Sequence, residues 1–146
     1  MPADLELVQR LADATHVAVV ATTRPDGSVH ASLVSAGVLA NPATAEPAVG
    51  IVIGGDTRKL RHLRRTGRGA AVFQRGFEWV AVEGPVTIIG PDDPSADVPA
   101  ADVPELLRAV FKAAGGTHDD WAEYDRVMEA ERRTAVFIEP SRITSN

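Results

Sequence analysis

Residues 15–40 read THVAVVATTRPDGSVHASLVSAGVLA, and this stretch decides the fold. Its first part, Thr15–Thr23, is rich in valine and threonine, which favour strands. Arg24–Gly27 follows with a proline and a glycine at positions that suit a tight turn. Ser28–Ala40 then has the composition of a second strand, so the stretch predicts an antiparallel hairpin.

The rest of the chain repeats this alternation of strands and turns. Further strands are predicted at residues 48–54, 69–74, 78–89 and 134–139, and loops at 41–47 and 91–104. Helices are predicted at residues 4–13, 56–65, 104–114 and 118–133. Because most strands follow each other through turns, we expect a mainly β fold with flanking helices, its antiparallel sheet closed into a small barrel. A chain of 146 residues is expected to form one domain.

Composition excludes several classes of protein. The chain is 45% hydrophobic and 24% charged, which excludes disorder as the main state. No apolar run approaches the roughly 20 residues of a membrane helix, and residues 1–15 have no signal-peptide core, so no membrane partner is expected. The absence of cysteine removes disulfides and thiolate metal sites, and it fits a cytoplasmic protein. The common dinucleotide, phosphate-loop and nucleophile-elbow motifs are missing.

Positive charge is concentrated in one segment. Residues 57–75 hold seven of the 15 basic residues and no acidic residue, although the net charge is −5. This segment is either a solvated helix face or an anion site. Nucleic-acid binding through the basic helix is the weaker interpretation, because no Phe, Tyr or Trp lies between the arginines of residues 56–65 to stack on bases. No nucleic-acid partner is therefore expected.

The sequence Gly54-Gly55-Asp56-Thr57-Arg58-Lys59 is the strongest candidate for an anion site. A predicted strand ends here, two glycines let the backbone turn, and a helix begins. The first N–H groups of a helix have no partner within it and favour phosphate. The hydroxyl of Thr57 and the cationic groups of Arg58 and Lys59 add donors. The alternative is a capped helix with a basic surface.

Two other features have a structural and a functional interpretation. Trp79 shares a strand face with Ala81 and Glu83, where it is a core residue or the wall of a site for a flat ring. His118-Asp119-Asp120 has metal-ligating side chains but is interpreted as a helix cap, because aspartate in a first turn favours the helix dipole. We predict no metal site, and the sequence identifies no catalytic residue.

These residues resemble a known family. Thr57-Arg58-Lys59, Leu63, the run 67–72 and the run 78–84 are similar in order and spacing to the pyridoxamine 5′-phosphate oxidase-like split β-barrel superfamily. The C-terminal run with His118-Asp119-Asp120-Trp121, Tyr124, Met128 and Glu131-Arg132-Arg133 resembles its branch of small deazaflavin (coenzyme F-420)-dependent reductases. The resemblance implies a six-stranded split barrel, and a homodimer that holds its cofactor in a groove between subunits.

The resemblance also implies a set of cofactor-binding residues. Thr57, Arg58 and Lys59 would hold the cofactor phosphate, with Asp56 beside them and Leu63 on the same helix. The backbone of His30-Ala31-Ser32-Leu33-Val34 would lie along the ring system, and Trp79 near the cofactor edge. The segment from Gln74 to Gly76 would close over the cofactor.

The implied activity is hydride transfer from coenzyme F-420 to an unsaturated small molecule. The pyridoxamine oxidases carry Arg and Lys on their second strand for the FMN phosphate, and Ser28–Leu39 contains neither. FMN remains the alternative cofactor, because Arg58 and Lys59 would serve its phosphate too. A carrier that binds a flavin or deazaflavin without turnover is the non-enzymatic alternative.

Overall fold

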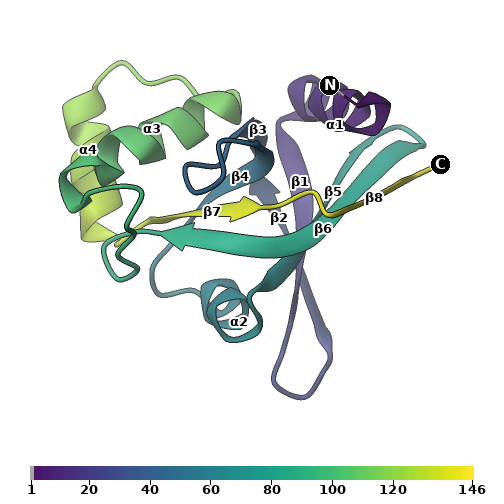
Figure 1. The fold of residues 1–146 in the computed structure, drawn as a ribbon. Coiled ribbons are helices and arrows are strands. Elements are labelled where there is room, and N and C mark those ends of the chain that lie inside the picture. The colour runs from purple at the N-terminus through teal and green to yellow at the C-terminus, as the bar shows by residue number, and fades with distance from the viewer. Residues whose placement is uncertain (1) are drawn as a thin grey trace.

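A computed structural model describes residues 2–146 (Figure 1). Its strands are β1 (Val17–Thr23), β2 (Val29–Ser35), β3 (Gly37–Ala40), β4 (Pro47–Ile53), β5 (Arg68–Arg75), β6 (Glu78–Ile89), β7 (Thr134–Ile138) and β8 (Arg142–Ser145). Its helices are α1 (Ala3–Thr15), α2 (Arg58–Thr66), the 3₁₀ turn η1 (Ala100–Asp102), α3 (Val103–Ala113) and α4 (Trp121–Ala130). The predicted mainly β fold with flanking helices is confirmed.

All strands belong to one antiparallel sheet. Its order is β2-β1-β5-β6-β7-β4-β3, and β8 pairs with β6. The predicted hairpin is present, with Val17 opposite Ser35 at one end and Thr23 opposite Val29 at the other. Gly27 has a φ of +89° in its turn, a conformation that glycine adopts without strain.

The expected six strands are eight in the structure, for two reasons. The predicted strand Ser28–Ala40 divides at Ala36, which is fully buried and donates its N–H to the carbonyl of His16 at 3.0 Å. Before this point the chain pairs with β1, and after it with β4. The second reason is β8, which adds to the edge of β6 after the last predicted strand.

Strand β6 joins the two parts of the sheet. Its residues up to Glu83 pair with β8, and those from Val86 pair with β7, while β5 lies along its other edge. At the change of partner, a Cβ on Gly84 would lie 2.0 Å from the carbonyl oxygen of Glu139. The adjacent Pro85 accepts a hydrogen bond from the N–H of Glu139 at 2.9 Å. Glycine is therefore required where the chain after β7 crosses β6.

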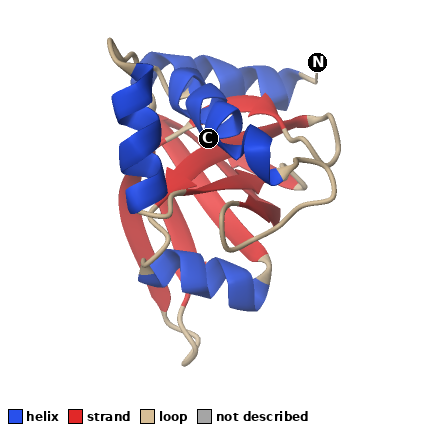
Figure 2. Cartoon of the chain, turned by 90° about the vertical axis from the view of Figure 1, so that its left-hand side faces the viewer, coloured by secondary structure: helices blue, strands red, loops and turns tan. Residues whose placement is uncertain are grey.

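Two buried clusters hold the molecule together. One fills the inside of the curved sheet under α1 and α2, and includes Leu11, Leu60 and Phe73. The other, with Leu107 and Phe137, lies where α3 and α4 pack on β4 and β7. Helices α3 and α4 thus gather at the end of the molecule opposite to β8 and the C-terminus (Figures 1 and 2). Strands β4 and β7 are consequently buried on both faces.

The outer surface of β1, β2, β5 and β6 has no such cover, and we call it the outer face. Along these strands, residues of the outer face alternate with buried residues. Val19 is 41% exposed and Leu33 67% exposed, whereas Val20 is buried. Val19 lies opposite both Leu33 and Val72, and Val72 lies opposite Ala81. Strand periodicity therefore assigns the following residues to the outer face: Val17, Val19, Val29, Ala31, Leu33, Val72, Gln74, Trp79 and Ala81.

Helix α4 is shorter than the predicted helix at residues 118–133. The Asp120 carboxylate accepts the N–H of Glu123 at 3.1 Å, which confirms the interpretation of His118-Asp119-Asp120 as a cap. The helix ends at Ala130, and Arg132 has a φ of +49° in the turn that leads into β7. No helix within residues 2–146 is long and apolar enough to cross a membrane.

Candidate functional site

A pocket of about 450 Å³ lies between the sheet and the helices α2, α3 and α4. This volume is within the range of small-molecule sites. The walls combine apolar and aromatic side chains with a few polar groups, as such sites do. They are formed by Leu33, Val34, Ser35, Val52, Ile53, Gly54, Thr57, Lys59, Val110, Phe111, Ala114, Tyr124, Met128 and Arg133.

The charge of this pocket has one sign. Lys59 and Arg133 are its charged lining residues, and no carboxylate lines it. Burial lowers the pKa of Lys59, and the nearby charge of Arg133 lowers it further. Arg133 also binds the carboxylate of Glu131 at 3.1 Å. Two neighbouring cations in a partly buried pocket repel each other, so an anion bound there would stabilise both.

The glycines before α2 bring the two cations together. The N–H of Gly55 donates to the carbonyl of Glu131 at 3.2 Å, and a Cβ on Gly55 would lie 2.4 Å from the carbonyl oxygen of Arg132. A Cβ on Gly54 would lie 4.0 Å from the guanidinium carbon of Arg133. The loop thus packs directly on the turn before β7. Gly55 is required for this close approach and not for an unusual backbone angle, because it has no positive φ.

The start of α2 provides N–H groups beside Lys59. The first helical hydrogen bond joins the N–H of Arg61 to the carbonyl of Thr57 at 3.4 Å, so the N–H groups of Arg58 and Lys59 precede it. The Thr57 hydroxyl caps the helix: it accepts from the N–H of Leu60 at 3.4 Å and donates to the carbonyl of Gly54 at 3.0 Å. The Thr57 hydroxyl is therefore already used within the protein. The donors available to an anion here are the backbone N–H groups and the Lys59 ammonium.

Helices α3 and α4 form an aromatic wall. The rings of Phe111 and Tyr124 lie 4.9 Å apart, and the Tyr124 hydroxyl donates to the carbonyl of Leu107 at 3.2 Å. Burial raises the pKa of Tyr124 to about 12, so this hydroxyl keeps its proton at neutral pH. Arg108 and Asp125 join the two helices through bonds of 2.9 and 2.5 Å. Tyr124 is therefore a structural element of the wall and a poor proton donor.

The structure brings four of the sequence-predicted residues to this pocket: Leu33, Val34, Thr57 and Lys59. Asp56 and Arg58 flank Thr57 in the chain, but their side chains are exposed and do not line the pocket. The predicted roles of Asp56 and Arg58 remain predictions.

The other predicted residues lie elsewhere. Ala31, Gln74 and Trp79 are on the outer face, and Gly76 is at the tip of the β5–β6 hairpin. His30 and Ser32 face inward, where the Ser32 hydroxyl is buried and has no hydrogen-bond partner within residues 2–146. Leu63 is fully buried in the core, so its visible role is packing.

The lining residues that the sequence did not predict include those with the largest side chains, namely Phe111, Tyr124, Met128 and Arg133. The first three belong to α3 and α4, whose packing on the sheet is a long-range event. Arg133 follows Arg132 at the end of the helix predicted at residues 118–133. This pair of arginines is the only local sequence feature that could have indicated a cation of the site. No group of three metal-ligating side chains is close enough to hold a metal within residues 2–146.

Fold and pocket together define a β-rich protein with a cation-lined small-molecule pocket between sheet and helices. The family model for pyridoxamine 5′-phosphate oxidase matches residues 5–144. The chain belongs to that family.

Solved structures with different ligands share this fold. An FMN-binding protein related to pyridoxamine 5′-phosphate oxidase, from Nostoc punctiforme, is 13% identical and has a TM-score of 0.66; the match covers 98% of this chain and 81% of that chain. An F-420 reductase is 14% identical with a TM-score of 0.65, covering 93% of this chain and 94% of that chain. A heme binding protein from Mycobacterium smegmatis is 17% identical with a TM-score of 0.63, and the match covers 100% of this chain but 58% of that chain. At these identities the likeness shows the fold alone.

Proposed function

We propose that this protein is an oxidoreductase that binds deazaflavin coenzyme F-420 and transfers hydride to an unsaturated small molecule. The observation that carries the proposal is the pocket with two cations, no lining carboxylate, and apolar and aromatic walls. Such a site suits a flat ring with a negatively charged tail. The cofactor, when bound, supplies the hydride chemistry, and the protein binds and orients it.

The protein's own residues would bind, orient and shield the cofactor. Lys59, Arg133 and the N–H groups at the start of α2 would hold the phosphate. Phe111, Tyr124 and Met128 would supply apolar contacts and exclude water from the ring. The remaining predicted phosphate ligand, Arg58, would act from the exposed side of the helix start.

We also propose that the active form is a cytoplasmic homodimer, with the second copy on the outer face. Leu33 supports this arrangement, because it belongs both to the outer face and to the pocket lining. A partner laid on the outer face would therefore cover the pocket mouth as well. Ala31, Gln74 and Trp79, which lie outside the pocket of one chain, would then border a groove between two chains.

FMN is the alternative cofactor on the same site. Lys59 and Arg133 offer charge-assisted bonds to any phosphate, and the pocket contains no group that selects deazaflavin over flavin. The same geometry also supports a carrier that binds either cofactor without turnover.

The deciding experiment is a titration of the purified protein with F-420 and with FMN in one buffer, followed by cofactor fluorescence. Tighter binding of F-420, and consumption of reduced F-420 with a quinone, an enone or a tetrapyrrole, would support the reductase. Tighter binding of FMN would favour the alternative enzyme, and binding without consumption would favour the carrier. No binding of either cofactor at about 10 μM would refute the proposal. The absorbance spectrum of the protein as purified reveals any bound flavin or haem.

A further inference from the structure

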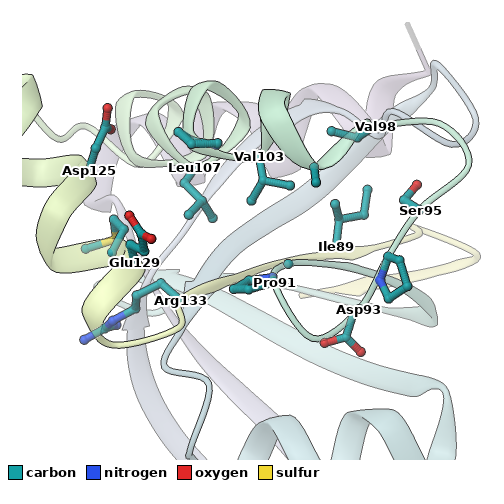
Figure 3. A pocket seen from close by; sticks show the side chains of 15 residues that line it. Ile89, Pro91, Asp93, Ser95, Val98, Val103, Leu107, Asp125, Glu129 and Arg133 are labelled. Carbon is teal, nitrogen blue, oxygen red and sulfur yellow. The ribbon is translucent and has the colours of Figure 1, made fainter.

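A second cavity, of about 460 Å³, adjoins the first pocket at Met128 and Arg133, which line both. It is bordered by the end of β6, the loop at residues 90–98, η1, α3 and α4. Figure 3 shows Ile89, Val103 and Leu107 along its length, with Glu129 and Arg133 at the α4 end and Val98 at the opposite end. This volume again falls within the range of small-molecule sites.

The walls of this cavity are mostly apolar, and their charged groups are carboxylates and the guanidinium of Arg133. Three carboxylates line it, and two of them already have partners: Asp93 binds Arg64 at 2.5 Å, and Asp125 binds Arg108 at 2.5 Å. Glu129 is the third, and within residues 2–146 it forms no ion pair or side-chain hydrogen bond. An apolar chamber with one free carboxylate at its end is complementary to a hydrophobic molecule that carries one positive group.

The contrast with the first pocket strengthens this assignment. Both cavities share Met128 and Arg133 as lining residues, yet the first has no carboxylate and the second has three. Arg133 is already paired with Glu131, which lines neither cavity. The two adjoining cavities differ in their charged groups, because only the second contains carboxylates. They would therefore select different ligands, so the second cavity is not an extension of the phosphate site.

We propose that this cavity is a second small-molecule site, for a hydrophobic amine whose apolar body lies against Ile89, Val103 and Leu107 and whose ammonium group faces Glu129. The site lies beyond the proposed cofactor pocket and does not depend on which cofactor that pocket takes. Its ligand is recognised by shape and by one charge, without a covalent step.

Binding of 4-phenylbutylamine, 4-phenylbutanol and 4-phenylbutanoate, measured by calorimetry on the full chain, tests the site. We expect the amine to bind most tightly and the carboxylate most weakly. Glu129→Gln should weaken the amine about two- to fivefold, as for an exposed ion pair, and leave the alcohol unchanged. Ala100→Trp should abolish binding of all three, because Ala100 lies on an exposed turn at the cavity rim and a large ring there fills the entrance.

Two controls separate this site from the first pocket. Glu105→Gln removes an exposed carboxylate from α3 outside the cavity and should change nothing. Lys59→Ala alters only the first pocket, so it should leave amine binding intact even if it abolishes cofactor binding. Amide shifts in the NMR spectrum should concentrate at Val98, Val103 and Leu107. The proposal is overturned if the amine fails to bind at about 1 mM, binds no better than the alcohol, or shifts residues of the first pocket instead.

Discussion

The meaning of Lys59 depends on Arg133, a residue far away in the chain. The sequence places Lys59 at a helix start and favours an anion ligand there, with a surface cation as the alternative. In the structure the two side chains line the same pocket, and the charge of Arg133 contributes to the lowered pKa of Lys59. An anion bound between them would stabilise both charges, which gives the pocket its chemical identity.

Replacing Lys59 or Arg133 by alanine should therefore separate binding from stability. Each lost charged hydrogen bond should cost about 1.5–3 kcal/mol of cofactor binding free energy. The Tm should not fall for Lys59→Ala, because that change relieves repulsion between the two cations. Cofactor titration and thermal unfolding measure both effects.

Arg61→Ala is the matched control, since Arg61 lies on the same helix but is exposed and outside the pocket. Equal losses of affinity for Arg61→Ala and Lys59→Ala would show that only the general charge of α2 matters.

His62 gives the protein a specific acid sensitivity. It is buried, and its Nδ1 lies 2.9 Å from the Thr22 hydroxyl. Burial is the main reason that its pKa is lowered from the ordinary 6.5, and the neighbouring side chains of Arg65, His30, Arg24 and Arg61 lower it further. The folded state thus binds this proton less readily than the unfolded state does. Its contribution to stability is complete above pH 6.5 and is lost as the pH falls below 6.5 toward the folded-state pKa.

Urea unfolding between about pH 5 and 8 measures this effect. The wild-type protein should lose stability toward pH 5, and His62→Gln, which cannot titrate, should lose less. Parallel pH profiles for the two proteins would exclude His62 as the cause.

At the scale of elements, the loop before α2 depends on the turn before β7. The sequence predicts that a strand ends at the two glycines and that a helix begins after them, and the structure has both elements. It could not show that Gly55 approaches the backbone of Arg132, because that contact joins segments distant in the chain.

Gly55→Ala should therefore destabilise the protein by about 1–3 kcal/mol, as overpacking does. The added Cβ would lie 2.4 Å from a backbone oxygen, which cannot move aside as a side chain can. Gly54→Ala is the control: its nearest contact is 3.3 Å, to the methyl group of Thr57. Denaturant unfolding compares the two, and equal losses would mean that the close contact at Gly55 is not the cause.

Strand periodicity explains which elements were predicted well. β1 alternates between exposed and buried residues, as a strand covered on one side does. β4 is a nearly continuous apolar run because it is covered on both sides. The break at Ala36 was missed, since the apolar run continues through Gly37 and only the change of pairing partner separates β2 from β3.

At the scale of the whole molecule, the outer face is the surface on which we expect the second copy of the proposed homodimer. One chain shows the residues that line its own pocket, but it does not show which residues border a groove between two chains. If the second copy covers the outer face, Val19→Glu should give a monomer of half the mass that remains folded, because Val19 is 41% exposed in one chain. Size-exclusion chromatography with light scattering measures the mass.

Ala101→Glu, on the exposed turn η1, should leave the mass unchanged. A wild-type protein that is monomeric at working concentrations would contradict the dimer.

The double role of β6 has a consequence for how the protein melts. Because this strand is hydrogen-bonded to β5 and β8 along one part and to β7 along the other, neither portion of the sheet keeps a complete set of neighbours if the other comes apart. We expect one calorimetric peak whose van't Hoff and calorimetric enthalpies agree. Two resolved peaks would mean that the strand yields at Pro85 and that the halves melt as separate units.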